Sequence, residues 1–174
     1  MKTRQSVIII LCAMAGTGMW GGCNKPSRVE QHRAEKHQSD SVRLEEQIRT
    51  LGFYQMQLDS LMPVSDSLIA LFEYERNEQY QDHGYYVVKK AAFKKMPSDL
   101  RIMVRDDGKD IAVYKSGKRL SEEESMSLDG TPGGEAYGAA QHLQIVIRDI
   151  RECENRIDHT SLEVQKYQKR LQKN

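Results

Sequence analysis

The sequence is poor in cysteine, in aromatic residues and in long apolar runs. Its 174 residues include three cysteines, one tryptophan and 7% aromatic residues. The apolar run at residues 7–15 is roughly half of the ~20 residues that a membrane-spanning helix needs. These shortages argue against a disulfide-stapled fold and against a permanent transmembrane helix.

Net charge is also small. The chain has 26 basic and 25 acidic residues, and removal of residues 1–22 takes away Lys2 and Arg4, which leaves 24 against 25. Such a balance provides no global attraction to nucleic acid, so we expect no nucleic-acid partner. Because 29% of the residues are charged, the composition favours long solvated helices over a compact enzyme core.

The first 22 residues have the pattern of an export signal. Lys2 and Arg4 precede the apolar run at 7–15, and small residues lead to Gly21-Gly22-Cys23. That order of charge, apolar run and small residues is typical of a cleaved signal peptide. An ordinary secretory signal, cleaved nearby, would leave Cys23 as a free thiol.

The end of this segment resembles the lipobox of bacterial lipoproteins. In that motif the cysteine, here Cys23, becomes the first residue and is acylated; Trp20 stands where the motif usually has Leu. The resemblance implies three acyl chains on Cys23, and stable anchoring takes about two. Residues 24–28 lack an early acidic cluster that resembles a surface-export tag. We therefore expect a lipid-anchored protein of the cell envelope, on the outer membrane and facing the periplasm.

Cys153 would then be the only free thiol of the mature chain, which allows no intramolecular disulfide. It is interpreted as a small apolar residue in a helix seam. An intermolecular crosslink or a catalytic thiol is the alternative.

Two segments have heptad patterns. After an anchor and tether at 23–40, a helix is predicted over 41–82, with a kink near Pro63 because proline interrupts helical hydrogen bonding. Its apolar positions alternate by four and three and fall into two registers: Leu44, Leu51, Leu58 and Phe72; Ile48, Met62 and Ile69. After a linker at 121–134, a second helix is predicted over 135–173. A strict seven-residue repeat supports it: Ala136, Leu143, Ile150, Ile157, Val164 and Leu171.

Residues 84–120 change to the period of β-strands. Residues 85–89, 100–105 and 111–114 are predicted as strands, and Asp106-Asp107-Gly108-Lys109 is a strong hairpin turn. A short fourth strand near 118–120 is left open. The expected fold is α+β, mainly α: a long antiparallel helical hairpin, or coiled coil, with a three- to four-stranded antiparallel β meander inserted at its tip. Each helix would span about 60 Å, and homo-oligomerisation through the coiled coil is expected.

Few residues suggest chemistry. Asp106, Asp107 and Asp110 could form a calcium loop or an acid/base pair, but turn formation explains them, and the distal glutamate of a calcium loop is absent. We expect no cofactor, no metal and no catalytic residue. The candidate partner-binding residues combine aromatic and basic side chains in the meander: Tyr85, Tyr86, Lys89, Lys90 and Phe93.

The order of parts resembles uncharacterised coiled-coil lipoproteins of the Bacteroidales. Gly22-Cys23, a helix ending in Tyr80, and residues 84–89 carry the resemblance, which implies no activity. The favoured hypothesis is a non-enzymatic envelope lipoprotein whose stalk presents a β tip to a protein partner. One alternative is a periplasmic chaperone or assembly factor that holds client polypeptides; another is an enzyme with its site in the meander.

Overall fold

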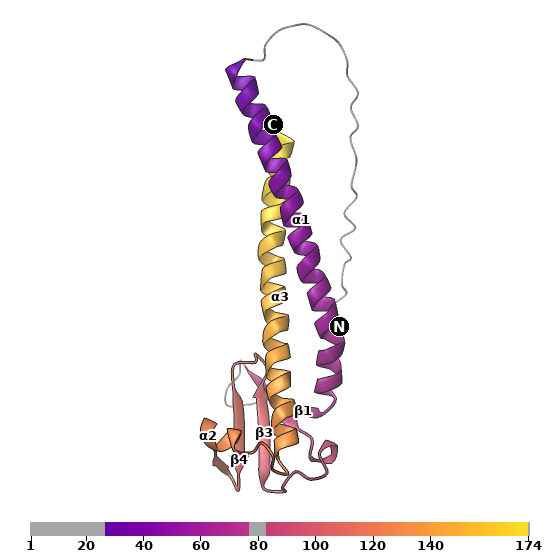
Figure 1. The fold of residues 1–174 in the computed structure, drawn as a ribbon, viewed down its shortest axis with the longest axis vertical. Helices are drawn as coiled ribbons and strands as arrows, with labels where there is room; N and C mark the ends of the chain where they lie inside the picture. The colour runs from indigo at the N-terminus through magenta and orange to yellow at the C-terminus, as the bar shows by residue number, and fades with distance from the viewer. Residues whose placement is uncertain (1–26, 77–82, 174) are drawn as a thin grey trace.

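The structure, a computed structural model, describes residues 27–76 and 83–173. Two long helices, α1 (Arg28–Ile69) and α3 (Gly134–Lys173), form a stem, and a five-stranded antiparallel sheet lies at one end of it (Figure 1). The α+β, mainly α, class is confirmed. Among the described residues, neither long helix has an apolar stretch that could cross a membrane.

α1 begins earlier than the heptads indicate. The Ser27 hydroxyl accepts a hydrogen bond from the Glu30 amide (3.3 Å), and the Ser27 amide donates to the Glu30 carboxylate (2.7 Å). This reciprocal pair is a capping box, which satisfies two amides that the first helical turn leaves free. The sequence predicts a tether over residues 23–40, but residues 28–40 are helical.

α1 continues through Pro63 instead of breaking there. Proline costs a helix interior about 3 kcal/mol because it removes a backbone donor. Side chains on both sides of it, Leu61 and Ser65, are shielded on the face of α1 that packs on α3, and this packing offsets the cost. The helix ends at Ile69, so the prediction that it reaches residue 82 is wrong: residues 72–76 form a strand.

The sheet is a simple meander in the order β1-β2-β3-β4-β5. Its strands are β1 (Phe72–Arg76), β2 (Gly84–Val88), β3 (Leu100–Arg105), β4 (Ile111–Lys115) and β5 (Lys118–Arg119). The count is five, where the sequence predicts three or four, because β1 adds an edge strand antiparallel to β2.

The turn between β3 and β4 is where the sequence places it. Gly108 has a φ of +70°, which favours glycine, and a Cβ there would lie 3.0 Å from the Gln144 carbonyl oxygen of α3. The hairpin end therefore packs closely on the helix backbone.

Most of the predicted linker 121–134 is turns, with one short helix, α2 (Glu122–Met126). Ser121 and Glu124 form a second capping box at its start. A 3-10 turn, η1 (Lys90–Ala92), lies in the connection between β2 and β3. Leu128, which follows α2, is buried in the main core.

The sheet packs on the first half of α3 and shares one core with it. The sheet side contributes Phe72, Val88, Leu100, Ile102, Val104 and Val113; the helix side contributes Ala136, Tyr137, Ala140, Leu143 and Ile147. Figure 1 shows α3 running alongside the strands. The meander is therefore not a separate tip beyond both helices, because α3 serves as its covering layer.

The two helices of the stem run antiparallel. The Cys153 thiol lies 3.9 Å from the Gln57 side-chain oxygen, and an Arg170 guanidinium nitrogen lies 3.8 Å from an Asp40 carboxylate oxygen. Earlier residues of α1 thus lie beside later residues of α3, as Figure 1 shows. The start of α1 and the end of α3 lie at the end of the stem away from the sheet.

The predicted seven-residue register lies on the shielded side of each helix, and its companion register is shifted by one residue in the far half of α3. In α3 the sequence predicts a companion register of Ala140, Ile147, Glu154, Ser161 and Gln168. Ala140 and Ile147 are buried, but beyond them the buried positions come one residue earlier, at Cys153, Thr160 and Tyr167. In α1 the shielded side beside Leu44, Leu51 and Leu58 includes Asp40, Gln47, Tyr54, Leu61 and Leu68, and the predicted companions Ile48, Met62 and Ile69 are half-buried as well.

Candidate interaction surfaces

The predicted partner-binding residues do not form one surface. Tyr85 and Tyr86 are neighbours in β2, so their side chains point to opposite faces of the sheet. Tyr86 and Phe93 pack against the core shared with α3. Tyr85 therefore lies on the other face of the sheet.

The two predicted lysines contact backbone carbonyl groups. Lys89 donates through Nζ to the Ala70 carbonyl oxygen (3.1 Å), at the junction between α1 and β1. Lys90 donates to the Ser98 carbonyl oxygen in the loop before β3. These bonds tie loops together, and they give both ammonium groups a structural role.

Asp106 joins the turn to the far edge of the sheet. Its carboxylate accepts hydrogen bonds from the Gly84 amide (2.8 Å) and the Tyr74 hydroxyl (3.2 Å), and Nδ1 of His83 lies 3.6 Å from its second oxygen. Burial, followed by the hydrogen bond to Asp106, raises the pKa of Tyr74. The phenol therefore stays a proton donor to the carboxylate near neutral pH.

Asp107 is the most deeply buried carboxylate of the turn, with a side chain only 1% exposed. Burial alone would raise its pKa, but the Arg105 guanidinium (2.6 Å) and the Lys109 amide (3.0 Å) outweigh burial and lower that pKa. The charge is thus held by two donors of its own hairpin. Both hydrogen bonds go to Oδ1, and they stabilise the turn.

Asp110 belongs to a third, separate contact. Its carboxylate accepts two hydrogen bonds from Arg119 of β5, at 3.1 and 3.0 Å. The three aspartates thus engage different partners, and within the described ranges no group of three or more His, Cys, Asp or Glu side chains could hold a metal ion.

Cys153 is buried in the seam between α1 and α3, the position interpreted from the sequence. Burial, then Asp149 and Glu152, raises the pKa of its thiol. Since the thiolate is the reactive form, both effects disfavour nucleophilic chemistry. A groove beside it runs between the two helices, lined by Tyr54, Gln57, Ser60, Leu61, Asp149 and Glu152.

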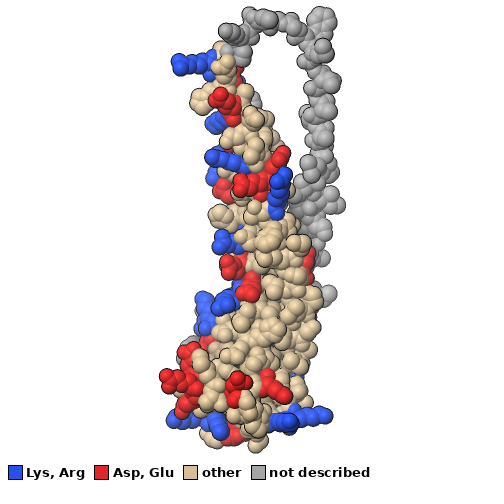
Figure 2. Space-filling model, viewed as in Figure 1, with Lys and Arg blue, Asp and Glu red and all other residues tan. Residues whose placement is uncertain are grey.

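A second apolar stripe runs along α1, outside its contact with α3. Phe53, Met56 and Val64 are 50%, 65% and 39% exposed, and spacings of three and eight residues place them on one face of the helix. Residues 50–70 contain only two charged residues, Asp59 and Asp66. Figure 2 shows the result as a broad uncharged surface on the part of the stem nearest the sheet.

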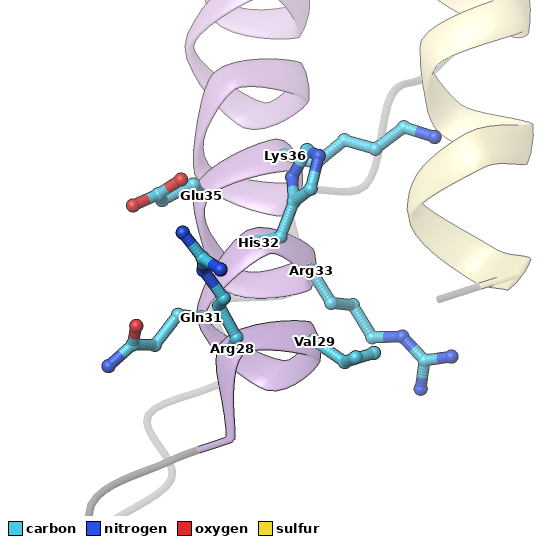
Figure 3. A pocket seen from close by; sticks show the side chains of 7 residues that line it. All are labelled: Arg28, Val29, Gln31, His32, Arg33, Glu35 and Lys36. Atoms are coloured by element: carbon cyan, nitrogen blue, oxygen red, sulfur yellow. The ribbon is translucent and has the colours of Figure 1, made fainter.

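The first turns of α1 carry a shallow hollow at the opposite end of the stem. Its side chains fan out from one helix without converging on a point: Arg28, Val29, Gln31, His32, Arg33, Glu35 and Lys36 (Figure 3). Arg33 and Lys36 extend toward the side where α3 ends. The hollow has no enclosing wall, and its chemistry is that of a basic surface.

The predicted lipidation residue, Cys23, lies outside the described residues. Comparisons with protein-family models, curated proteins and solved structures return no match to this chain.

Proposed function

We propose that the protein is a non-enzymatic envelope stalk, anchored to a membrane by acylated Cys23 and contacting a protein partner through the side of its stem. The carrying observation is the antiparallel stem. Cys23 precedes the first residue of α1 by five positions, and the sheet lies at the other end of a helix of 42 residues, about 60 Å away.

The stem supports a coiled-coil interpretation. Contact positions in the first helix follow one another by four and three residues from Asp40 to Leu68. This spacing is the seam of a left-handed coiled coil. Polar residues within the seam, such as Asp40 and Thr160, favour a single register over sliding alternatives.

We place the partner on the stem because Phe53, Met56 and Val64 form an exposed, uncharged apolar stripe there. Soluble monomers seldom expose contiguous apolar patches, and such patches mark interaction sites. The inner faces of α1 and α3 pack on each other, so the stem does not offer open arms that could hold a client polypeptide. The partner is either another protein or a second copy of this chain, bound along Phe53, Met56 and Val64.

A photo-crosslinking residue at position 56 tests this assignment in intact cells. Met56 and Leu162 are equally exposed, at 65%, and Leu162 lies on α3 away from the stripe, so position 162 is the matched control. We expect a discrete crosslinked species from position 56 only, with a doubled mass if the partner is a second copy. Equal products from both positions, or none from position 56, would contradict the proposal.

A further inference from the structure

The last turns of α3 carry a one-sided basic surface. Residues 164–173 contain four basic residues and no acidic residue. Lys166, Lys169, Arg170 and Lys173 are all exposed. Spacings of three, four and seven residues place them on a single face of the helix.

α1 adds basic side chains at the same end. The contact between Arg170 and Asp40 puts these two residues at one level of the stem. Lys173 then lies about 4.5 Å farther from the sheet and Lys36 about 6 Å farther, at a rise of ~1.5 Å per residue. Arg28 and Arg33 lie farther out along α1, and Figure 3 shows Arg33 and Lys36 extending toward the side of α3.

The stem is therefore electrically polarised along its length. Its outer end, residues 28–40 and 164–173, has seven basic and three acidic residues, a net charge of +4. The remainder of the stem, residues 41–69 and 134–163, has five basic and ten acidic residues, a net charge of −5. The difference follows position along the stem, since both helices contribute to it.

Helix stability explains only half of this pattern. Basic residues at the C-terminus of α3 interact favourably with the helix dipole, but basic residues in the first turns of α1 oppose it. In addition, five of the seven have no carboxylate within 4 Å among the described residues: Arg28, Arg33, Lys36, Lys169 and Lys173. Their charge is thus available to a ligand outside the chain.

We propose that this basic end, residues 28–40 with 164–173, lies against the anionic phospholipid headgroups of the membrane that holds the protein. The inference rests on the proposed anchor at Cys23. Five residues of fully extended chain span at most about 17 Å, so acylation would keep Arg28 close to the bilayer surface. Attraction to that surface is screened over ~8 Å at physiological salt, so the basic residues contribute only where this end of the stem lies against the bilayer, and it is the end of the stem nearest the anchor.

Flotation with vesicles tests the proposal without the acyl chains. Residues 24–174, which contain every described helix and strand, are mixed with vesicles of phosphatidylcholine alone or of equal parts phosphatidylcholine and phosphatidylglycerol. The variant replaces Lys166, Lys169 and Lys173 by Gln, and the matched control replaces three exposed lysines of the sheet region, Lys94, Lys95 and Lys118, by Gln. Both lose the same charge, and circular dichroism checks that both remain helical.

We expect selective binding to the anionic vesicles, weakened by salt. Because each basic residue near such a surface contributes about fivefold in affinity, the basic-end variant should bind at least about tenfold more weakly, and the control should change less than about twofold. Equal losses in both variants would overturn the proposal, and so would equal binding to both vesicle types. Retention on cell-wall polymer with no vesicle binding would overturn it in favour of a different occupant.

The outcome separates this proposal from the anchor itself. If the protein binds anionic vesicles selectively but is not acylated in cells, the proposed role of the basic end is supported and the proposed lipid anchor is refuted. If the protein is acylated in cells but shows no preference for anionic vesicles, the anchor is supported and the proposed role of the basic end is refuted.

Discussion

Leu143→Ala is expected to lower the free energy of unfolding by about 3–4 kcal/mol, the middle of the range for leucine truncation in a core. Leu143 is 0% exposed and belongs to the cluster that joins α3 to the sheet. The surrounding side chains come from two secondary-structure types, so they cannot collapse fully into the space that the substitution leaves. Urea denaturation followed by circular dichroism measures the change.

Leu162→Ala is the matched control, because it removes the same atoms from the same helix at a position that is 65% exposed. Its free energy of unfolding should change by no more than ~0.5 kcal/mol. A loss below about 1 kcal/mol for Leu143→Ala would mean that the sheet does not share its core with α3.

Asp107→Asn is expected to cost about 2–3 kcal/mol, the value of charge-assisted hydrogen bonds that lose their charge in a buried place. The amide can still accept one hydrogen bond, but the Arg105 guanidinium loses its counter-ion. Asp110→Asn is the control from the same loop: its pair with Arg119 is exposed, and exposed pairs contribute ~0–1 kcal/mol.

The wild-type protein should also lose stability in acid through Asp107. Its pKa is lowered in the folded state, so its contribution is complete above the ordinary aspartate pKa of ~3.9 and is lost as the pH falls below that value. Asp107→Asn should remove this part of the acid dependence. Denaturation curves at neutral pH and at pH values below ~4 compare the two proteins; identical acid dependence would show that Asp107 contributes nothing.

The heptads predicted the two long helices, but not the companion register in the far half of α3. Apolar residues at Leu51 and Leu58, or at Ile150 and Ile157, mark the seam clearly. Their companions can lie three or four residues away, and the true ones in α3 include Cys153 and Thr160, which carry a weak apolar signal. Which of the two spacings faces the seam depends on the position of the other helix, so the periodicity of one helix alone does not predict it.

The two ends of α1 are determined by local sequence features that compete with the heptad pattern. The capping box of Ser27 and Glu30 is readable in the sequence, and it would have moved the start of the helix to Arg28. At the other end, Phe72 fits the heptad register and also begins β1. Three of the next four residues, Glu73, Glu75 and Arg76, are charged, so alternation alone gives little indication of an edge strand.

Strand geometry alone argues against the predicted partner-binding patch. Tyr85 and Tyr86 are adjacent, and adjacent strand residues point to opposite faces. The stripe of Phe53, Met56 and Val64 is also visible as a spacing, but its exposure is not, because exposure depends on which face of α1 packs on α3.

The most direct test of the anchored-stalk account is metabolic labelling with a radioactive or alkyne fatty acid, followed by separation of membranes from soluble exported protein. The account predicts that the wild-type protein and a Cys153→Ser control are labelled and sediment with membranes, whereas Cys23→Ser is unlabelled and lost from the membrane fraction. An unlabelled wild-type protein, or a Cys23→Ser protein that keeps its label, would contradict it.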